Sequence, residues 1–436
     1  MALKKVTLGL EAEMFLLDSN GLVVNKADLL MRKARHKGIS HFPVEVSKSF
    51  IEIGSRPHGR VLGLTRNFFS NLEKVIETAE SIGLHLYPFG AYPGKSTPIM
   101  RSRPWYNALH SIFGQAFVDV ACKVCSFQFH FSTPRGVIDR SEGVLSAKIK
   151  RSRDVYLNQF NFLVAADPAL STFLQSSPYH DGELVGKDAR MFLWRAMKAE
   201  KGAPFDGLFS SHSLFGGLPR YATSIYDLKA LSEKRKRAFV AELRRKTGSA
   251  SMDILKRSPL KFDWGPVRAN PLGTIEVRGM DMNTPMQMIA ASSLLKRFLR
   301  EIFLGNVNVV VDELAIRKPF LLEDGVVFIP PYSYVNSELQ YLSASEGLES
   351  KKVHGYCKAF YKTALQLNSD NKRFLSGVEK MLSTRKTKAD EIIDAAGRAK
   401  SIALDEQGEL ALKLSRNFLD ETEKVREIIS HDFEAI

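Results

Sequence analysis

The stretch CSFQFHFST, residues 125–133, alternates polar and aromatic side chains with a period of two. Successive residues of a β-strand point to opposite faces of a sheet, so this alternation predicts a strand with two unlike faces. Three phenylalanines make up one face, and the other face carries Ser126, Gln128, His130 and Ser132. The aromatic face is expected to pack on a core, which leaves the function of the polar face to be explained.

Three other apolar stretches carry glutamate on one face in the same way: TLGLEAEMFLL (7–17), SFIEIGSRP (49–57) and GTIEVRGMD (273–281). The polar members of these faces are Glu11 and Glu13, then Glu52, and finally Glu276 with Arg278. For any single strand, a face that meets water is the simpler explanation. Because glutamate recurs across the strands while lysine is nearly absent, a shared functional face is favoured for the set.

Several carboxylates on one sheet face repel each other unless cations lie among them. Oxygen ligands together with one imidazole suit Mg²⁺, with Mn²⁺ as the alternative. Protein carboxylates and substrate phosphates typically share Mg²⁺ between them, and an arginine two residues from a carboxylate would meet the remaining phosphate charge. The four strands therefore indicate phosphoryl transfer from ATP.

The stretch FGAYPGKST (89–97) is close to a phosphate-binding P-loop, but it is one residue short because Phe89 stands where glycine is required. Pro98 and Pro104 follow where a helix should begin, which favours an extended loop. We therefore expect the nucleotide site elsewhere. Lys95 and Arg101 are candidates for the mouth of that site, although an exposed loop explains them more simply.

The chain has 436 residues, of which 44% are hydrophobic and 25% charged, as in large soluble proteins. No apolar run reaches the roughly 18 residues of a membrane helix, and glutamates interrupt the N-terminus where a secretory signal would be apolar, so a cytoplasmic location is expected. The net charge of +14 raises the alternative of nucleic-acid binding. The basic residues are scattered without interleaved aromatics, which favours anionic metabolites instead. Cys122 and Cys125 lack the second pair of a zinc site.

Apolar periodicity predicts an α+β fold, a curved and mostly antiparallel sheet flanked by helices, followed by a helical C-terminal region. The expected strands are 5–17, 44–54, 84–92, 122–134 and 272–282, with a last strand and turn near 325–340. The expected helices are 62–82, 106–120, 143–165, 187–199, 226–246 and 285–304, followed by three helical segments within 352–434. We divide the chain into a catalytic domain, 1–340, and a helical extension, 341–436.

The motifs on these strands resemble those of the type 2 glutamate–cysteine ligases, also called carboxylate–amine ligases. They are, in order, GLEAE (9–13), IEIGSRP (51–57), FQFHFS (127–132), DWGPVRANPLGTIEVR (263–278) and TPMQMIAASSLL (284–295). The resemblance implies a catalytic domain like those of glutamine synthetase and the guanido kinases. Two positions depart from the family pattern: Ala12 replaces a common acidic residue, and Gln128 replaces a frequent histidine.

The resemblance also implies roles for individual residues. The metal ligands would be Glu11, Glu13, Glu52, His130 and Glu276. Arg278 would contact the γ-phosphoryl group of ATP, and Arg268 and Arg190 would bind substrate carboxylate or phosphate, with a surface ion pair as the alternative for these two. Glu276, Arg278 and Arg268 would be the catalytic group. Glu45 matches a further acidic position of the wider superfamily.

The implied activity is an ATP- and Mg²⁺-dependent ligation, as in glutathione biosynthesis. A carboxylate, expected to be the γ-carboxylate of glutamate, becomes an acyl phosphate and is joined to an amine such as cysteine. The expected partners are small molecules, with neither membrane nor nucleic acid, and a homo-oligomer is compatible with the sequence. Because of Ala12 and Gln128, a catalytically weakened family member that binds a nucleotide or metabolite stays an alternative, as does a basic nucleic-acid-binding protein.

Overall fold

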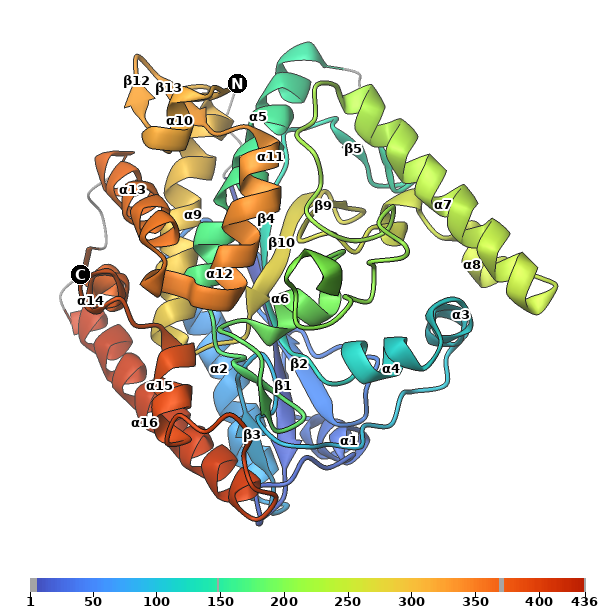
Figure 1. Cartoon of the computed structure of the whole chain (residues 1–436), viewed down its shortest axis with the longest axis vertical. Helices are drawn as coiled ribbons and strands as arrows, with labels where there is room; N and C mark the ends of the chain where they lie inside the picture. The colour runs from blue at the N-terminus through green and yellow to red at the C-terminus, as the bar shows by residue number, and fades with distance from the viewer. Residues whose placement is uncertain (1–5, 147–148, 368–371, 435–436) are drawn as a thin grey trace.

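The computed structural model describes residues 6–146, 149–367 and 372–434. An open antiparallel sheet lies at its centre, with strand order β2-β1-β4-β10-β9 and with β3 also paired to β1 (Figure 1). These strands are β1 (Leu8–Leu17), β2 (Phe50–Gly54), β3 (His85–Tyr87), β4 (Ser126–Ser132), β9 (Val267–Asn270) and β10 (Thr274–Asp281). The expected antiparallel sheet is therefore confirmed, and β9 is an additional edge strand.

The register of the strands aligns their polar residues on one face of the sheet. Glu13 lies opposite Glu52, and Glu11 lies opposite Gln128. His130 lies opposite Glu276, which in turn lies opposite Arg268. Residues directly opposite in an antiparallel pair project to the same side. The polar faces inferred from the sequence therefore form one continuous surface.

Helices cover the apolar face of the sheet. The buried phenylalanines of β4 and the apolar residues of β10 belong to one core. The helices α5 (Lys150–Phe173) and α9 (Pro285–Leu304) pack against this face, and α2 (Val61–Glu80) packs against β1, β2 and β3. The aromatic side of CSFQFHFST therefore faces the core, as its alternation predicts.

The remaining elements surround this centre. The other helices are α1 (Ala27–Ala34), α3 (Pro104–Phe113), α4 (Gln115–Ala121), α6 (Ala189–Trp194), α7 (Ile225–Thr247), α8 (Met252–Lys256), α10 (Leu314–Arg317), α11 (Tyr332–Tyr334) and α12 (Gln340–Glu346). The short strands are β5 (Ile138–Asp139), β6 (Val144–Leu145), β7 (Tyr179–His180), β8 (Glu183–Leu184), β11 (Asn308–Val311), β12 (Leu322–Glu323) and β13 (Val326–Ile329).

Several expected boundaries are wrong for identifiable reasons. The expected helix 106–120 is two helices, α3 and α4, because Gly114 between them has φ +67°, outside the helical region. The expected helix 143–165 begins only at Lys150, because Val144–Leu145 pairs with Ile138–Asp139 in a hairpin. The expected strand 44–54 begins only at Phe50.

The described residues beyond 350 form four α-helices rather than three segments: α13 (Lys351–Leu367), α14 (Ser376–Thr384), α15 (Lys388–Ala395) and α16 (Glu406–Glu434). In Figure 1 they lie along one side of the molecule, where α13 packs on α5 and α9, and α16 packs on α2, α9 and β3. One cluster of buried apolar side chains includes residues from before and after residue 340. The division into two domains at that residue stays a prediction. None of the helices in the described ranges is long and apolar enough to cross a membrane.

Candidate active site

Three carboxylates converge on the polar face of the sheet. The oxygen atoms of Glu13, Glu45 and Glu52 lie within 4.8 Å of one another. Hydrogen bonds hold Glu13 in place, because its Oε2 accepts from the backbone N (2.6 Å) and the Oγ (2.9 Å) of Ser126. The amide of Gln128 donates from Nε2 to Glu13 (3.2 Å) and to Glu52 (3.5 Å), so this residue links two of the carboxylates.

Glu45 joins this group from a loop rather than from a strand. The buried guanidinium of Arg101 fixes the loop by donating from Nη1 to the carbonyl oxygens of Glu45 (2.7 Å) and Ser47. Its other nitrogens donate to Asp28 Oδ1. Arg101 therefore positions a carboxylate of the site, although it does not itself line the cavity as the sequence suggested.

A second group lies beside the first and contains His41, and His130 contacts one of its carboxylates. The ligand atoms of Glu11, His41 and Glu52 lie within 4.8 Å of one another, with His41 Nε2 3.5 Å from Glu11 and 3.3 Å from Glu52. His130 Nε2 lies 3.3 Å from Glu11 Oε2, and His130 Nδ1 lies 3.1 Å from the Thr274 hydroxyl. The second imidazole nitrogen therefore has a partner that orients the ring.

The surroundings make charge unfavourable on most of these carboxylates. Burial and the neighbouring glutamates raise the pKa of Glu52 well above its ordinary value, and burial with the charge of Glu13 raises the pKa of Glu45 to about 7. Burial also raises the pKa of Glu13, and Arg190 and Ser126 offset part of this rise. Glu11 differs, since burial is outweighed by the hydrogen bond and charge of His130, which lower its pKa.

Glu276 lies among arginines rather than among glutamates. Its Oε2 accepts from Arg268 Nε (2.8 Å) and Asn270 Nδ2 (2.6 Å), and Arg278 Nη1 lies 3.3 Å from its Oε1. Although burial disfavours the carboxylate charge, Arg268 and Arg278 hold the pKa of Glu276 well below its ordinary value. Arg190 approaches from α6 and donates from Nη2 to the carbonyl oxygen of Arg278 (2.9 Å).

A cavity of about 420 Å³ joins the acidic and basic halves. Its volume lies within the usual range for small-molecule sites. Trp105, Trp264, Arg257 and Lys261 line its basic half, with the Arg257 guanidinium 4.5 Å from the centre of the Trp105 ring. Four carboxylates therefore lie at the β1–β2 side of one cavity, and guanidinium groups surround the remaining one, that of Glu276, at the β9–β10 side.

The structure brings the sequence-predicted residues to this one cavity. Glu11, Glu13, Glu52, Glu276, Arg278, Arg268 and Arg190 line it, and His130 contacts Glu11 beside it. The carboxylate groups able to hold a cation contain Glu11, Glu13 and Glu52, whereas Glu276 and His130 are not members of those groups in the described part of the chain. Buried carboxylates in close contact that resist ionisation fit a divalent cation with oxygen ligands.

Sequence reasoning missed several residues of the cavity. His41 lies in a loop where strand periodicity gives no signal, whereas Glu45 in the same loop was named through its match to the wider superfamily. Lys261 and Arg257 lie in or beside short helical turns, η2 (Pro259–Phe262) and α8. Asn270 stands in the R-x-N-P motif, so its place beside Arg268 was the signal that could have identified it.

Two other sequence features lie outside the site. After Gly94-Lys95-Ser96, the next helix in the described chain begins only at Pro104, so the P-loop geometry is absent from that stretch. The backbone N of Lys95 donates to Gln407 Oε1, and Lys95 is not among the described residues of the cavity. All three cysteines are free and buried.

The fold is similar to the folds of two ligases of glutathione synthesis. A bifunctional glutathione synthetase from Pasteurella multocida superimposes with a TM-score of 0.59 and 14% sequence identity, over 95% of this chain. This chain spans about half of that protein, 52% of its length. A glutamate–cysteine ligase from Francisella tularensis, solved in complex with AMP, superimposes with a TM-score of 0.51 and 11% identity, over 99% of this chain and 94% of that one.

The sequence profile of glutamate–cysteine ligase family 2 matches residues 7–408. The chain therefore belongs to this family, whose members are ATP-dependent ligases. A search of curated protein sequences gave no significant match. The family resemblance drawn from the strand motifs is confirmed.

Proposed function

We propose that the chain is an ATP- and Mg²⁺-dependent carboxylate–amine ligase that activates the γ-carboxylate of glutamate and joins it to an amine. The observation that carries this proposal is the group of Glu13, Glu45 and Glu52, whose oxygen atoms lie within 4.8 Å of one another in a cavity that four arginines also line. Family membership supports the class of reaction. Cysteine is the first amine to test, because the family is described by that substrate.

Glu11, Glu13, Glu45 and Glu52 would hold the divalent cations, with His130 and Glu276 at their border. When bound, such cations neutralise the phosphate charge of ATP and favour in-line displacement. The glutamates of this chain would hold the positive charge of the cations at the β1–β2 side of the cavity. His130 orients Glu11 through their contact of 3.3 Å. This proposed set keeps Glu11, Glu13 and Glu52 from the set expected from the sequence, adds Glu45 and His41, and places His130 and Glu276 outside the two groups.

The arginines would hold the transferring phosphoryl group. Arg278 reaches Glu276 with one nitrogen, while its buried Nε has no hydrogen-bond acceptor in the described part of the chain. The buried Nε of Arg190 likewise has no hydrogen-bond acceptor among the described residues. Arg268 is bound to Glu276 and to the carbonyl oxygen of Asp263, so it acts as a positioning residue for Glu276. Guanidinium groups fixed in this way stabilise charge that develops on phosphate oxygens.

The proposed reaction has two steps. A carboxylate oxygen of the substrate attacks the γ-phosphorus of ATP, and the bond to the β-phosphate oxygen breaks, which gives an acyl phosphate and ADP. The amine nitrogen then attacks the acyl carbon, phosphate leaves, and the nitrogen loses a proton to form the amide. Holding the reactants in line is worth about 7–11 kcal/mol in well-oriented systems.

The test measures ADP and phosphate release with Mg-ATP, glutamate and a panel of amines that begins with cysteine. We expect release to require both glutamate and an amine, and the variant Glu13→Gln to reduce it by about a hundredfold or more. The control Glu80→Gln alters an exposed glutamate at the end of α2 and should leave turnover unchanged. Mg-ATP binding without turnover for any amine would instead identify a weakened, ligand-binding member of the family.

A further inference from the structure

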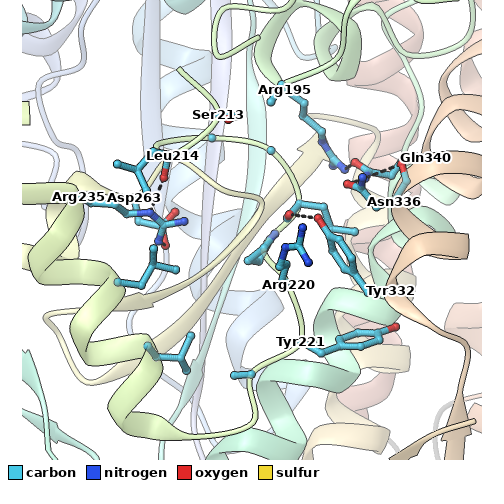
Figure 2. Close-up of a pocket in the computed structure, with 18 of the residues that line it drawn as sticks. Arg195, Ser213, Leu214, Arg220, Tyr221, Arg235, Asp263, Tyr332, Asn336 and Gln340 are labelled. Carbon is cyan, nitrogen blue, oxygen red and sulfur yellow. Dashed lines mark hydrogen bonds and ion pairs between the residues drawn. The ribbon is translucent and has the colours of Figure 1, made fainter. Parts of the chain in front are cut away.

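A second, larger cavity lies behind the candidate active site. Its volume is about 690 Å³, and its walls come from α5, the loop 195–223, α7, β9, α11 and the start of α12 (Figure 2). We name it the rear cavity. None of the described residues that line it also lines the candidate active site. A volume of this size accommodates a small metabolite.

The two cavities share a wall but not their side chains. Along three segments, neighbouring residues alternate between them. Trp194, Lys261, Trp264 and Arg268 line the active site, whereas the adjacent Arg195, Leu260, Asp263 and Ala269 line the rear cavity. On β9 this alternation follows from the period of two in a strand. The rear cavity is therefore a separate compartment rather than an extension of the ATP site.

The buried charges in the rear cavity are already paired. Arg195 donates from Nη2 to Asp167 (3.0 Å) and from Nη1 to Asp167 and to Gln340. Arg235 forms an ion pair with Asp263 and donates from Nε to the carbonyl oxygen of Leu214 (2.7 Å). Because these groups are satisfied, they shape the cavity and leave the binding of a ligand to other residues.

Unpaired positive charge lies at the mouth. Arg220 and Lys201 are exposed, and no carboxylate of the described residues lies within ion-pair distance of either. Figure 2 shows Arg220 beside the Tyr332 ring, whose centre lies 5.7 Å from the guanidinium carbon. The one carboxylate that Lys198 reaches among the described residues is that of the exposed Glu200, at 4.0 Å. The exposed carboxylate of Asp227 also lines the cavity, but these three cations outnumber it, so the mouth favours an anion.

The loop that carries Arg220 also offers backbone donors. Gly216, Gly217 and Leu218 line the cavity, and their amide N–H groups have no acceptor among the described residues. Gly217 has φ +91°, in the region that favours glycine. Successive N–H groups in a turn of this kind form a concavity that binds anions. Gly216 and Leu218 are buried, where unpaired N–H groups are rare.

Fixed aromatic rings form the apolar wall. Tyr221 and Tyr332 meet edge to face with their centres 6.0 Å apart. Their hydroxyls donate to the carbonyl oxygens of Pro330 (2.8 Å) and Leu218 (2.8 Å), so the rings are held in place and the second bond ties one ring to the donor loop. Rigid rings beside an anion site favour a ligand that has a planar part.

We propose that the rear cavity binds a small organic anion with a planar ring. Its phosphate or carboxylate contacts the N–H groups of residues 216–218 and the guanidinium of Arg220, and its ring packs on Tyr221 and Tyr332. This second ligand site is separate from the proposed ligase chemistry and does not depend on it.

Calorimetric titration with two probes, phenyl phosphate and benzoate, tests the proposal and shows which anionic group is preferred. We expect at least one probe to bind. Phenol lacks the anionic group and inorganic phosphate lacks the ring, so each should bind at least tenfold more weakly. Arg220→Ala should weaken binding about tenfold, as loss of one charge-assisted contact predicts. Arg317→Ala changes an exposed arginine of α10 and should leave the affinity unchanged.

The variant Glu13→Gln separates the two sites, because it alters the active site and should leave probe binding intact. The proposal is overturned if neither probe binds at millimolar concentration, or if Arg220→Ala binds both probes as tightly as the natural chain. It is also overturned if Mg-ATP displaces the probe competitively, since the probe would then occupy the active site. No turnover is needed, so a failure of the proposed ligase activity would leave this result unaffected.

Discussion

Gln128 connects the carboxylates of Glu13 and Glu52 by donating a hydrogen bond to each. Replacing it in Gln128→Glu removes this donor and adds a further negative charge beside carboxylates that already resist ionisation. We expect the metal-free variant to lose about 1–3 kcal/mol of unfolding free energy. Saturating Mn²⁺ should recover much of this loss, because a cation would gain a ligand. Urea unfolding with EDTA and with Mn²⁺ measures both quantities.

Gln366→Glu serves as the matched control for this prediction. Gln366 is exposed on α13, and no side-chain hydrogen bond is found for it within the described ranges. The same change of charge there should alter stability by less than about 0.5 kcal/mol. An equal loss in Gln128→Glu with and without Mn²⁺ would show that the carboxylate group does not take up a cation.

Glu45 makes the stability of the metal-free protein depend on pH. Its pKa is raised from 4.5 to about 7 by burial and the charge of Glu13, so the folded state holds a proton that the unfolded state has released between these values. Stability from this residue is therefore highest below pH 4.5 and is lost as the pH rises through 7. Between pH 5 and pH 8, the natural chain should lose more stability than Glu45→Gln. Denaturant titrations in EDTA at several pH values test this, and parallel curves would contradict it.

At the residue scale, the sequence predicted the strand-borne members of the site and not those on loops. Glu11, Glu13 and Glu276 follow the period of two, which shows the face of the strand on which each lies even when the neighbouring strands are unknown. His41 has no such pattern, because its position depends on packing between a loop and the sheet. Gly54 allows that packing, since a side chain there would meet His41 within 2.6 Å.

At the scale of elements, Arg101 holds the loop before β2 against the segment before α3. Arg101→Gln removes its bonds to the half-buried carbonyl oxygen of Glu45 and the buried one of Ser47. We expect a loss of roughly 2–4 kcal/mol in stability. We also expect weaker Mn²⁺ binding, because the loop carries Glu45. Thermal unfolding and Mn²⁺ titration of the folded variant measure the two effects.

Two control variants test whether these effects are specific to the bonds of Arg101 with the loop. Arg103→Gln alters an exposed arginine nearby and should change neither quantity appreciably. Asp28→Asn removes only the half-exposed partner of Arg101, so a loss below about 1 kcal/mol is expected. If Arg101→Gln bound Mn²⁺ with unchanged affinity, the loop would not determine the position of Glu45.

Among the elements, those with a long and regular period were predicted best. The helices α2, α7 and α9 begin and end within two residues of their expected bounds. The strand β9 escaped notice because VRAN, its four residues, is too short to display alternation, and its neighbours Pro266 and Pro271 are typical of turns. Its place at the sheet edge follows from pairing with β10, a contact that only the folded chain reveals.

At the scale of the whole molecule, the C-terminal helices complete the core behind the sheet. The ring of Phe360 on α13 lies 5.0 Å from that of Phe298, 5.2 Å from Phe320 and 6.2 Å from Phe162. Ser415 on α16 donates to the carbonyl oxygen of Leu86 on β3 (2.7 Å). All the candidate site residues lie before residue 340, yet the helices that support them receive part of their packing from beyond it.

This packing predicts that a chain ending at residue 340 does not fold stably by itself, even though it contains every candidate site residue. Phe360→Ala in the full chain isolates one part of the contact and should cost roughly 3–5 kcal/mol, because it leaves a cavity among aromatic rings. Tyr226→Ala alters an exposed ring on α7 and provides the control. Denaturant unfolding followed by circular dichroism measures all three chains. A cooperative transition of the shortened chain, with stability near that of the full one, would establish residues 1–340 as an independent domain and show that the shared core contributes little.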